Sequence, residues 1–198
     1  MPTKQLSTVF FNYQSTWDGM IIQHPYDVAE VAHKIALNAS RYRNVSLTTK
    51  VPWQVIGIIH YREGNLAFDT HLANGNPLTA RTINEPVGLP FTGTPPFTWE
   101  EGAIAAIEYD QLSKKSWGTL TNILQNMELY NGDGYLKYHP TIPSPYLWSY
   151  TQWYTKGKYQ SDGHFNPTLV DAQIGAAPLF RYLTDSTLGV IPHGGIIF

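Results

Sequence analysis

Residues 51–64 read VPWQVIGIIHYREG, and this stretch predicts a buried helix that ends in a carboxylate. Pro52 suits the first turn of a helix, because the N–H that proline lacks would have no partner there. Gly64 suits the position just past the last turn, where the backbone often becomes left-handed. Thr48 and Thr49 precede the stretch as candidate N-caps.

Helical spacing places Ile56, Ile59, His60 and Glu63 on one face. That face is otherwise apolar, so partial burial should disfavour the charged form of Glu63 and raise its pKa. The negative end of the helix dipole acts in the same direction. A carboxyl that is protonated near neutral pH is what a general acid for glycoside cleavage requires. The alternative is a helix-end residue that bends out into solvent, since Glu is seldom buried.

The composition is that of a globular chain with few charges and many aromatic rings. Its 198 residues are 42% hydrophobic, which suits one domain with a sizeable core. A formal net charge of −2 argues against nucleic-acid binding, which needs a basic surface. The absence of cysteine excludes disulfides and thiolate chemistry. The histidines show no metal-binding spacing, so we expect neither a metal nor a cofactor.

Hydrophobic periodicity predicts a mainly α chain with a small polar β-hairpin region and long aromatic loops. Thr98 and Glu101 form a capping-box pattern at the start of one helix. The Asn74-Gly75 pair predicts a tight turn within the polar stretch 65–82. Asp171 would supply a carboxylate to the first turn of the last helix. The helices are expected at about residues 26–43, 52–63, 98–112, 117–129 and 168–183.

Five blocks of sequence, taken in order, resemble a family of lysozyme-like peptidoglycan hydrolases of bacteriophages and bacteria. They are VPW leading to HYRE (51–63); Phe68 with HLANGNPL (71–78); PFTWEEGA (96–103); YNGDGY (130–135) followed by SPYLW (144–148); and KGKY (156–159) with Asp162-Gly163 and DAQIGAA (171–177). The blocks span roughly residues 15–184. The ordered set is fairly specific, although no single block would be.

The resemblance implies a single lysozyme-like catalytic domain over residues 1–198, in which the tail 185–198 is unassigned. It implies cleavage of peptidoglycan between its sugars, with Glu63 as the catalytic acid. The family pattern often carries an acidic residue at the position of Asn76, so a second carboxylate is missing there.

Two routes remain open for the second half of the reaction. Asp69 is the nearest acidic residue downstream of Glu63, and Thr70, Thr79 or Thr82 would then position water. Asp69 is also a good turn residue, because its side chain can bond its own backbone. Alternatively, Glu63 alone serves as base and acid while a substrate hydroxyl attacks, as in a lytic transglycosylase.

The expected sugar-binding residues lie in two regions. Aromatic rings and amides in the later loops can stack on sugars and bond their N-acetyl groups; these are Tyr130, Asn131, Tyr135, Tyr146, Trp148 and Tyr154. The polar stretch after the Glu63 helix would hold the opposite side through His60, Thr70, Asn74 and Thr82. Tyr146 and Trp148 could instead anchor a loop on the core.

The sequence thus predicts a muramidase or a lytic transglycosylase that acts as a monomer on peptidoglycan or a related N-acetylated glycan. Residues 1–14 lack the pattern of a secretion signal, and no apolar stretch is long enough to span a membrane. A phage endolysin, made in the cytoplasm and released to the cell wall, fits these features. The alternatives are a chitinase or chitosanase of related fold, and a glycan-binding or phage structural module without catalytic activity.

Overall fold

Nine α-helices and one two-stranded sheet make up the described part of the chain, which in the computed structural model is residues 12–161 and 163–188. The prediction of a mainly α chain is confirmed. The helices are α1 (Tyr13–Asp18), α2 (Pro25–Leu37), α3 (Ala39–Thr49), α4 (Trp53–Gly64), α5 (Trp99–Tyr109), α6 (Leu120–Tyr130), α7 (Gly134–Tyr138), α8 (Pro145–Trp148) and α9 (Ala176–Thr184). The strands are β1 (Lys158–Ser161) and β2 (His164–Asn166), and 3₁₀ turns lie at Leu112–Lys114 and Ser186–Leu188.

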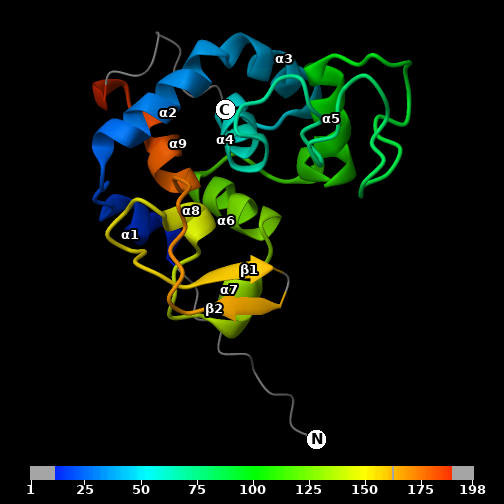
Figure 1. Cartoon of the computed structure of the whole chain (residues 1–198). Helices are drawn as coiled ribbons and strands as arrows, with labels where there is room; N and C mark the ends of the chain where they lie inside the picture. Colours follow the sequence, from blue (N-terminus) through cyan, green and yellow to red (C-terminus); the bar gives the residue numbers. More distant parts are fainter. Residues whose placement is uncertain (1–11, 162, 189–198) are drawn as a thin grey trace, which may run out of the picture.

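Helix α4 lies in the middle of the helical body, where α2, α3 and α9 pack against it (Figure 1). Ile56 and Ile59 on its predicted apolar face are buried, as that prediction requires. Gly57 faces Ile35 of α2 and Tyr42 of α3, and a Cβ at this position would collide with both side chains. The missing side chain therefore lets two neighbouring helices approach α4 closely.

The ends of α4 differ in detail from the prediction. Thr49 closes α3 instead of capping α4, and Pro52 is itself the N-cap residue. Gly64 is the last helical residue, and Asn65 takes the left-handed position with a φ of 47°. Asn is the residue that tolerates this conformation best after Gly, which explains the shift by one position. Glu63 is thus in the last turn, as expected.

Two other predicted helices have different bounds. The helix expected over 26–43 is two helices, α2 and α3, which meet at Asn38. The helix expected from residue 168 begins only at Ala176, so Asp171 lies in the loop before α9. By contrast, the capping box of Thr98 and Glu101 at the start of α5 is confirmed in both of its hydrogen bonds.

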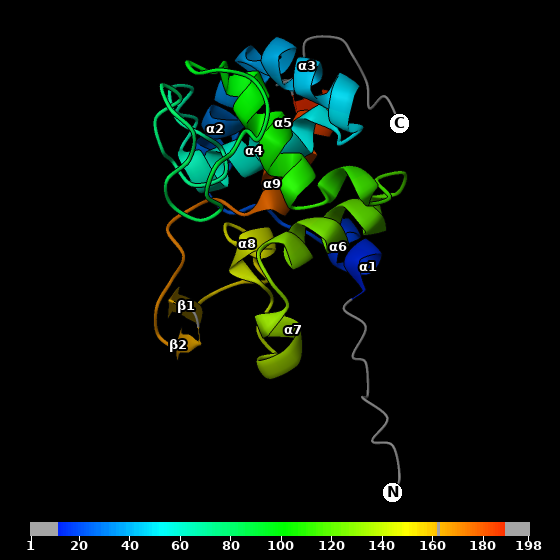
Figure 2. The same ribbon diagram turned by 90° about the vertical axis from the view of Figure 1, so that its right-hand side faces the viewer.

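The sheet lies in a lobe with α7, below α6 and α8 in Figure 2. Strands β1 and β2 are antiparallel, with Tyr159 opposite Phe165 and Lys158 opposite Asn166. The polar hairpin predicted at 65–82 forms no strand among the described residues, but an antiparallel bridge between Thr70 and Pro77 closes it. The predicted turn is present, because Gly75 has a φ of 74°. Backbone hydrogen bonds, such as that from His71 N to the Asn76 carbonyl at 2.7 Å, and polar side chains together hold the segment.

None of the helices in the described ranges has both the length and the apolar character needed to cross a lipid bilayer.

Candidate functional site

Glu63 stands in the last turn of α4, and the residue is open to solvent although protein surrounds part of its carboxyl. The Tyr146 hydroxyl, from α8, donates a hydrogen bond to Glu63 Oε1 at 3.2 Å. No hydrogen bond to Glu63 Oε2 is formed by the described residues. The carboxyl group is therefore reachable from solvent, and one of its two oxygens is held by the protein.

The protein around the Glu63 carboxyl raises its pKa above the usual value. Desolvation is the main cause, and the negative charge of Asp110 adds to it. The Tyr146 hydrogen bond and the positive charge of Arg62 oppose this rise but do not cancel it. Glu63 consequently keeps its proton to a higher pH than an ordinary glutamate, as a general acid must.

A cavity of about 730 Å³ lies beside Glu63 and separates the helical body from the α7–β1–β2 lobe. Glu63 itself does not line it, but Arg62 and Tyr146, which flank the carboxyl, do. The other lining residues are Asn131, Gly132, Asp133, Gly134, Tyr135, Tyr138, His139, Pro145, Lys158, Tyr159, Ser161, Gly163, Phe165 and Asp171. This size and mixture of rings and polar groups are typical of small-molecule sites.

The far wall of the cavity is an aromatic cluster made by Tyr135 and His139 with Tyr159 and Phe165. The His139 and Phe165 rings are stacked with centroids 3.7 Å apart, and the Tyr135 ring meets the Tyr159 ring edge-on at 5.3 Å. Of the cluster, sequence analysis identified only Tyr135. The pairing of β1 with β2 is what brings Tyr159 and Phe165 together, and no local pattern predicted it.

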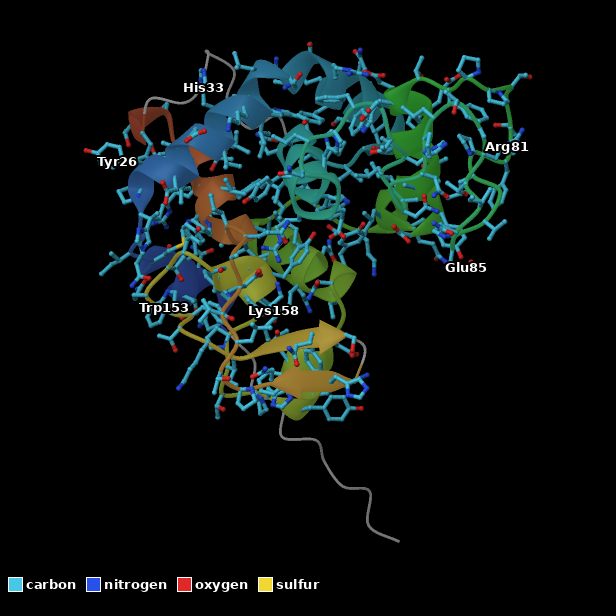
Figure 3. The ribbon with its side chains drawn as sticks, in the orientation of Figure 1. Tyr26, His33, Arg81, Glu85, Trp153 and Lys158 are labelled. Atoms are coloured by element: carbon cyan, nitrogen blue, oxygen red, sulfur yellow. The ribbon has the colours of Figure 1, made fainter. Side chains whose placement is uncertain are left out.

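Three charged side chains meet at the base of the cavity. Asp171 accepts from Arg62 Nη2 at 3.0 Å and from Lys158 Nζ at 2.7 Å. Figure 3 shows Lys158 at the junction of the lobe and the helical body. Burial would raise the pKa of Asp171, but the two cations and the Gln173 N–H hold it below the usual range. Asp171 therefore stays charged and ties β1 to α4.

Asp110 is a second carboxylate whose negative charge acts on Glu63, and sequence analysis missed it. It is the exposed C-cap residue of α5. Asp110 and Tyr130 line a smaller cavity of about 180 Å³. The Tyr130 ring lies 6.3 Å from that of Tyr146, which binds Glu63. Tyr130 is thus flanked by both carboxylates, whose charges raise its pKa further after desolvation.

One feature of the sequence could have pointed to Asp110 as an unusual carboxylate. An acidic residue at the C-terminal end of a helix faces the negative end of the helix dipole, which disfavours it. In the structure, desolvation raises the pKa of Asp110 as well.

Asp69 lies in the segment after α4 with an exposed side chain. Its backbone carbonyl accepts from Leu78 N at 3.3 Å, and none of the hydrogen bonds and ion pairs found in the described ranges joins its carboxylate to Glu63. Asn76 Oδ1 accepts from the backbone N–H groups of Ile83 and Asn84, at 2.8 and 3.1 Å. The Asn76 side chain therefore fastens a loop.

The other predicted binding residues of this region also bond to the protein itself. Thr70 donates weakly to the Ala67 carbonyl, at 3.5 Å, and Asn74 donates to the Asn84 carbonyl at 2.8 Å. Thr82 is buried, donates to the Pro86 carbonyl and accepts from Leu89 N. In Figure 3 the labelled residues Arg81 and Glu85 lie on the outer side of this segment, away from Lys158.

His60 is buried beneath the segment, and both ring nitrogens are engaged. Nδ1 lies 3.1 Å from the Tyr42 hydroxyl and Nε2 lies 2.9 Å from the Ala67 carbonyl. The ring also packs against Phe68 and Trp99. His60 therefore fixes the turn that follows Glu63, and its ring has no nitrogen left for a sugar.

The predicted aromatic residues fall into two groups. Asn131, Tyr135 and Tyr146 line the large cavity, and Tyr130 lines the small one. Trp148 and Tyr154 are buried in the core. The Tyr154 hydroxyl accepts from Asp171 N at 3.1 Å, which makes Tyr154 a support for the charged group and not a surface for sugars.

Acidification is expected to destabilise the fold through His60. Burial lowers the pKa of His60 from 6.5 to about 4. Between these values the unfolded chain binds a proton that the folded chain does not, so stability falls as the pH falls. The expected slope is about 1.4 kcal/mol per pH unit. Denaturant unfolding between pH 7 and pH 4 measures it. His60→Gln should flatten the slope whereas the exposed His33→Gln should not; equal slopes in all three proteins contradict the assignment.

In the described ranges, no group of three or more His, Asp or Glu side chains could hold a metal ion.

Comparison with family models, with curated proteins and with solved structures finds no match to this chain.

Proposed function

We propose that this protein cleaves the glycan strands of peptidoglycan, with Glu63 as the general acid. One observation carries the proposal: an accessible carboxyl with a raised pKa is held by Tyr146 at the edge of an aromatic cavity. The sequence resemblance to lysozyme-like peptidoglycan hydrolases supports the same role for the same residue. The fold expected from that resemblance, lysozyme-like, is part of this proposal.

The large cavity suits a neutral, N-acetylated sugar. Two cations, Arg62 and Lys158, and two carboxylates, Asp133 and Asp171, line it, so the lining residues sum to no net charge when His139 is neutral. Aromatic rings offer flat faces to pyranose rings, and the Asn131 amide can bond an N-acetyl group. A strand bound in this cavity and extended past Tyr146 would bring a glycosidic oxygen to Glu63.

In the proposed reaction Glu63 gives its proton to the glycosidic oxygen as the bond from that oxygen to the sugar carbon breaks. A water molecule attacks the same carbon and passes a proton to Asp110. The products are two shorter strands, one with a new reducing end. Two carboxylates in these roles are the general pattern of glycoside hydrolysis.

The presence of a second carboxylate, Asp110, favours a hydrolase over a lytic transglycosylase. A transglycosylase needs only one acid, because the substrate's own hydroxyl attacks and an anhydro sugar forms. A chitinase or chitosanase would share the chemistry of Glu63 but act on unsubstituted glycans.

The test is digestion of purified peptidoglycan by the wild-type protein in water enriched in heavy oxygen. Mass spectrometry is expected to find one heavy oxygen at each new reducing end. Anhydro products without the label would indicate a transglycosylase, and cleavage of chitin oligosaccharides in preference to peptidoglycan would indicate a chitinase. Wall binding without any cleavage would reject catalysis and favour a glycan-binding module.

A further inference from the structure

Tyr146 is buried, yet it contacts the exposed Glu63. Its side chain is 2% exposed, and the hydroxyl reaches Glu63 Oε1 at 3.2 Å. The ring is enclosed on two sides, with the Tyr130 ring centroid 6.3 Å away and the Arg62 guanidinium carbon 4.6 Å from the ring centroid. A ring confined in this way holds its hydroxyl in one place. Such burial fits the loop anchor that the sequence left open for Tyr146 beside the role of a sugar-binding ring.

Arg62 is fixed as firmly as the ring it touches. Its side chain is 6% exposed, and that of its partner Asp171 is 1% exposed. Nη2 donates to Asp171 Oδ2 at 3.0 Å, and Nη1 donates to the Ile174 carbonyl at 3.2 Å. Buried ion pairs of this kind hold a geometry even where they add little stability.

Arg62 and Glu63 are consecutive residues of α4, so their side chains leave the helix in different directions. Arg62 turns into the protein, towards the loop before α9, while Glu63 turns out to solvent. Tyr146 bridges the two, because its ring lies against Arg62 and its hydroxyl meets Glu63. The buried charge is thereby linked to the exposed carboxyl through one rigid side chain.

We propose that Asp171, Arg62 and Tyr146 form a positioning unit that orients the carboxyl of Glu63 for proton donation. This inference rests on the proposed function of Glu63. Asp171 fixes the guanidinium, the guanidinium supports the ring, and the ring hydroxyl holds Oε1. The proton is then carried by Oε2, the oxygen without a protein partner among the described residues. An otherwise flexible glutamate is held in one orientation before substrate arrives.

The unit also adjusts the acidity of Glu63. Three groups affect its charge: Tyr146 and Arg62 lower its pKa and Asp110 raises it, whereas the nearby Tyr130 is neutral at ordinary pH. A hydrogen bond donated to a carboxylate stabilises its charged form, which is the form left after proton transfer. Removal of the Tyr146 hydroxyl should therefore raise the pKa of Glu63 further.

Tyr146→Phe is the test, because it keeps the buried ring and removes only the hydroxyl. Glu63 can take a hydrogen bond from solvent in exchange, so the variant is expected to fold. We expect kcat to fall about tenfold with KM nearly unchanged, as for one hydrogen bond to a charged group. The alkaline limb of the pH–rate profile should move to higher pH. The pKa of the Glu63 carboxyl, measured by carbon-13 NMR, should also rise. The Glu63 signal is assigned as the carboxyl resonance that is missing from the spectrum of Glu63→Gln.

Tyr13→Phe is the matched control. The Tyr13 hydroxyl also donates to a carboxylate, Glu128 Oε2 at 2.6 Å, but it does so between α1 and α6. This variant is expected to leave the Glu63 titration and the alkaline limb unchanged. Arg62→Lys is the second test of the unit. It keeps the charge but loses the planar group that supports the ring, so it should lower kcat and, by loosening the Tyr146 hydrogen bond, raise the pKa of Glu63.

Two results separate this inference from the proposed function. If the pKa of Glu63 is the same in Tyr146→Phe as in the wild type, the positioning unit is overturned, even if the variant is slower. A Tyr146 that only supported the fold would change the rate and leave the pKa of Glu63 unchanged. Failure of the wild-type protein to cleave peptidoglycan overturns the proposed function, and the inference with it. Cleavage by wild type together with a raised titration in Tyr146→Phe supports both.

Discussion

Glu63→Gln is expected to lower the rate of cell-wall clearing by about 10²–10⁴-fold and to leave wall binding intact. Gln has nearly the same shape as Glu and can still accept the Tyr146 hydrogen bond, but its amide cannot supply the proton that the leaving oxygen needs. Turbidity loss of purified walls measures the rate, and co-sedimentation with walls measures binding. A thermal melt checks that the fold is unchanged.

Glu108→Gln is the control for this change. Glu108 is an exposed carboxylate of α5 whose Oε2 accepts from Ser113 at 2.7 Å, and no hydrogen bond or ion pair found between described residues joins it to Glu63. This variant should clear walls at the wild-type rate. Equal clearing by Glu63→Gln and wild type would remove Glu63 from the mechanism.

Asp110→Asn is expected to slow wall hydrolysis by about 10²-fold, because it removes the group that takes the proton from water. The variant should fold normally, since Asp110 is exposed and caps α5 through its backbone N–H. The loss of its negative charge should also lower the pKa of Glu63. The alkaline limb of the pH–rate profile should then move to lower pH, opposite to the shift expected for Tyr146→Phe.

Asp69→Asn and added azide together test the assignment of Asp110. Asp69→Asn should retain a near-normal rate if Asp69 is a turn residue. Azide attacks a sugar carbon without needing a base, so it should restore cleavage by Asp110→Ala and yield a glycosyl azide. A slow Asp69→Asn beside a normal Asp110→Asn would make Asp69 the second carboxylate. Normal rates in both variants would favour the route that uses Glu63 alone.

The parts of the fold that sequence predicted are those specified by neighbouring residues. The apolar spacing of α4 and the Thr98–Glu101 capping box are local patterns, and both are present in the structure. The break between α2 and α3 at Asn38 was missed because the apolar spacing continues across it. The β1–β2 hairpin was missed because short strands rich in aromatic residues resemble loops in sequence.

In the candidate site, too, some residues are identified by local sequence patterns and others only by the tertiary structure. Glu63 was identified because its own helix gives it a position and an environment. Asp110 is far along the chain from Glu63, whose pKa it affects, and Asp171 is far from Arg62, with which it pairs. Both interactions therefore depend on how the helices pack. Tyr146 was identified, but as a surface for sugars. Its burial and its bond to Glu63 follow from tertiary contacts that no local pattern contains.

The shared carboxylate of Asp171 has a mechanical consequence. Lys158 belongs to the hairpin and Arg62 to the central helix, and both donate to the same carboxylate. If the hairpin swung outward, Asp171 would keep its buried partner Arg62, and only the ion pair with the one-third-exposed Lys158 would be lost. Dissolved salt screens such a partly exposed pair. We therefore expect the hairpin to swing away from the helix more readily in brine than in dilute buffer.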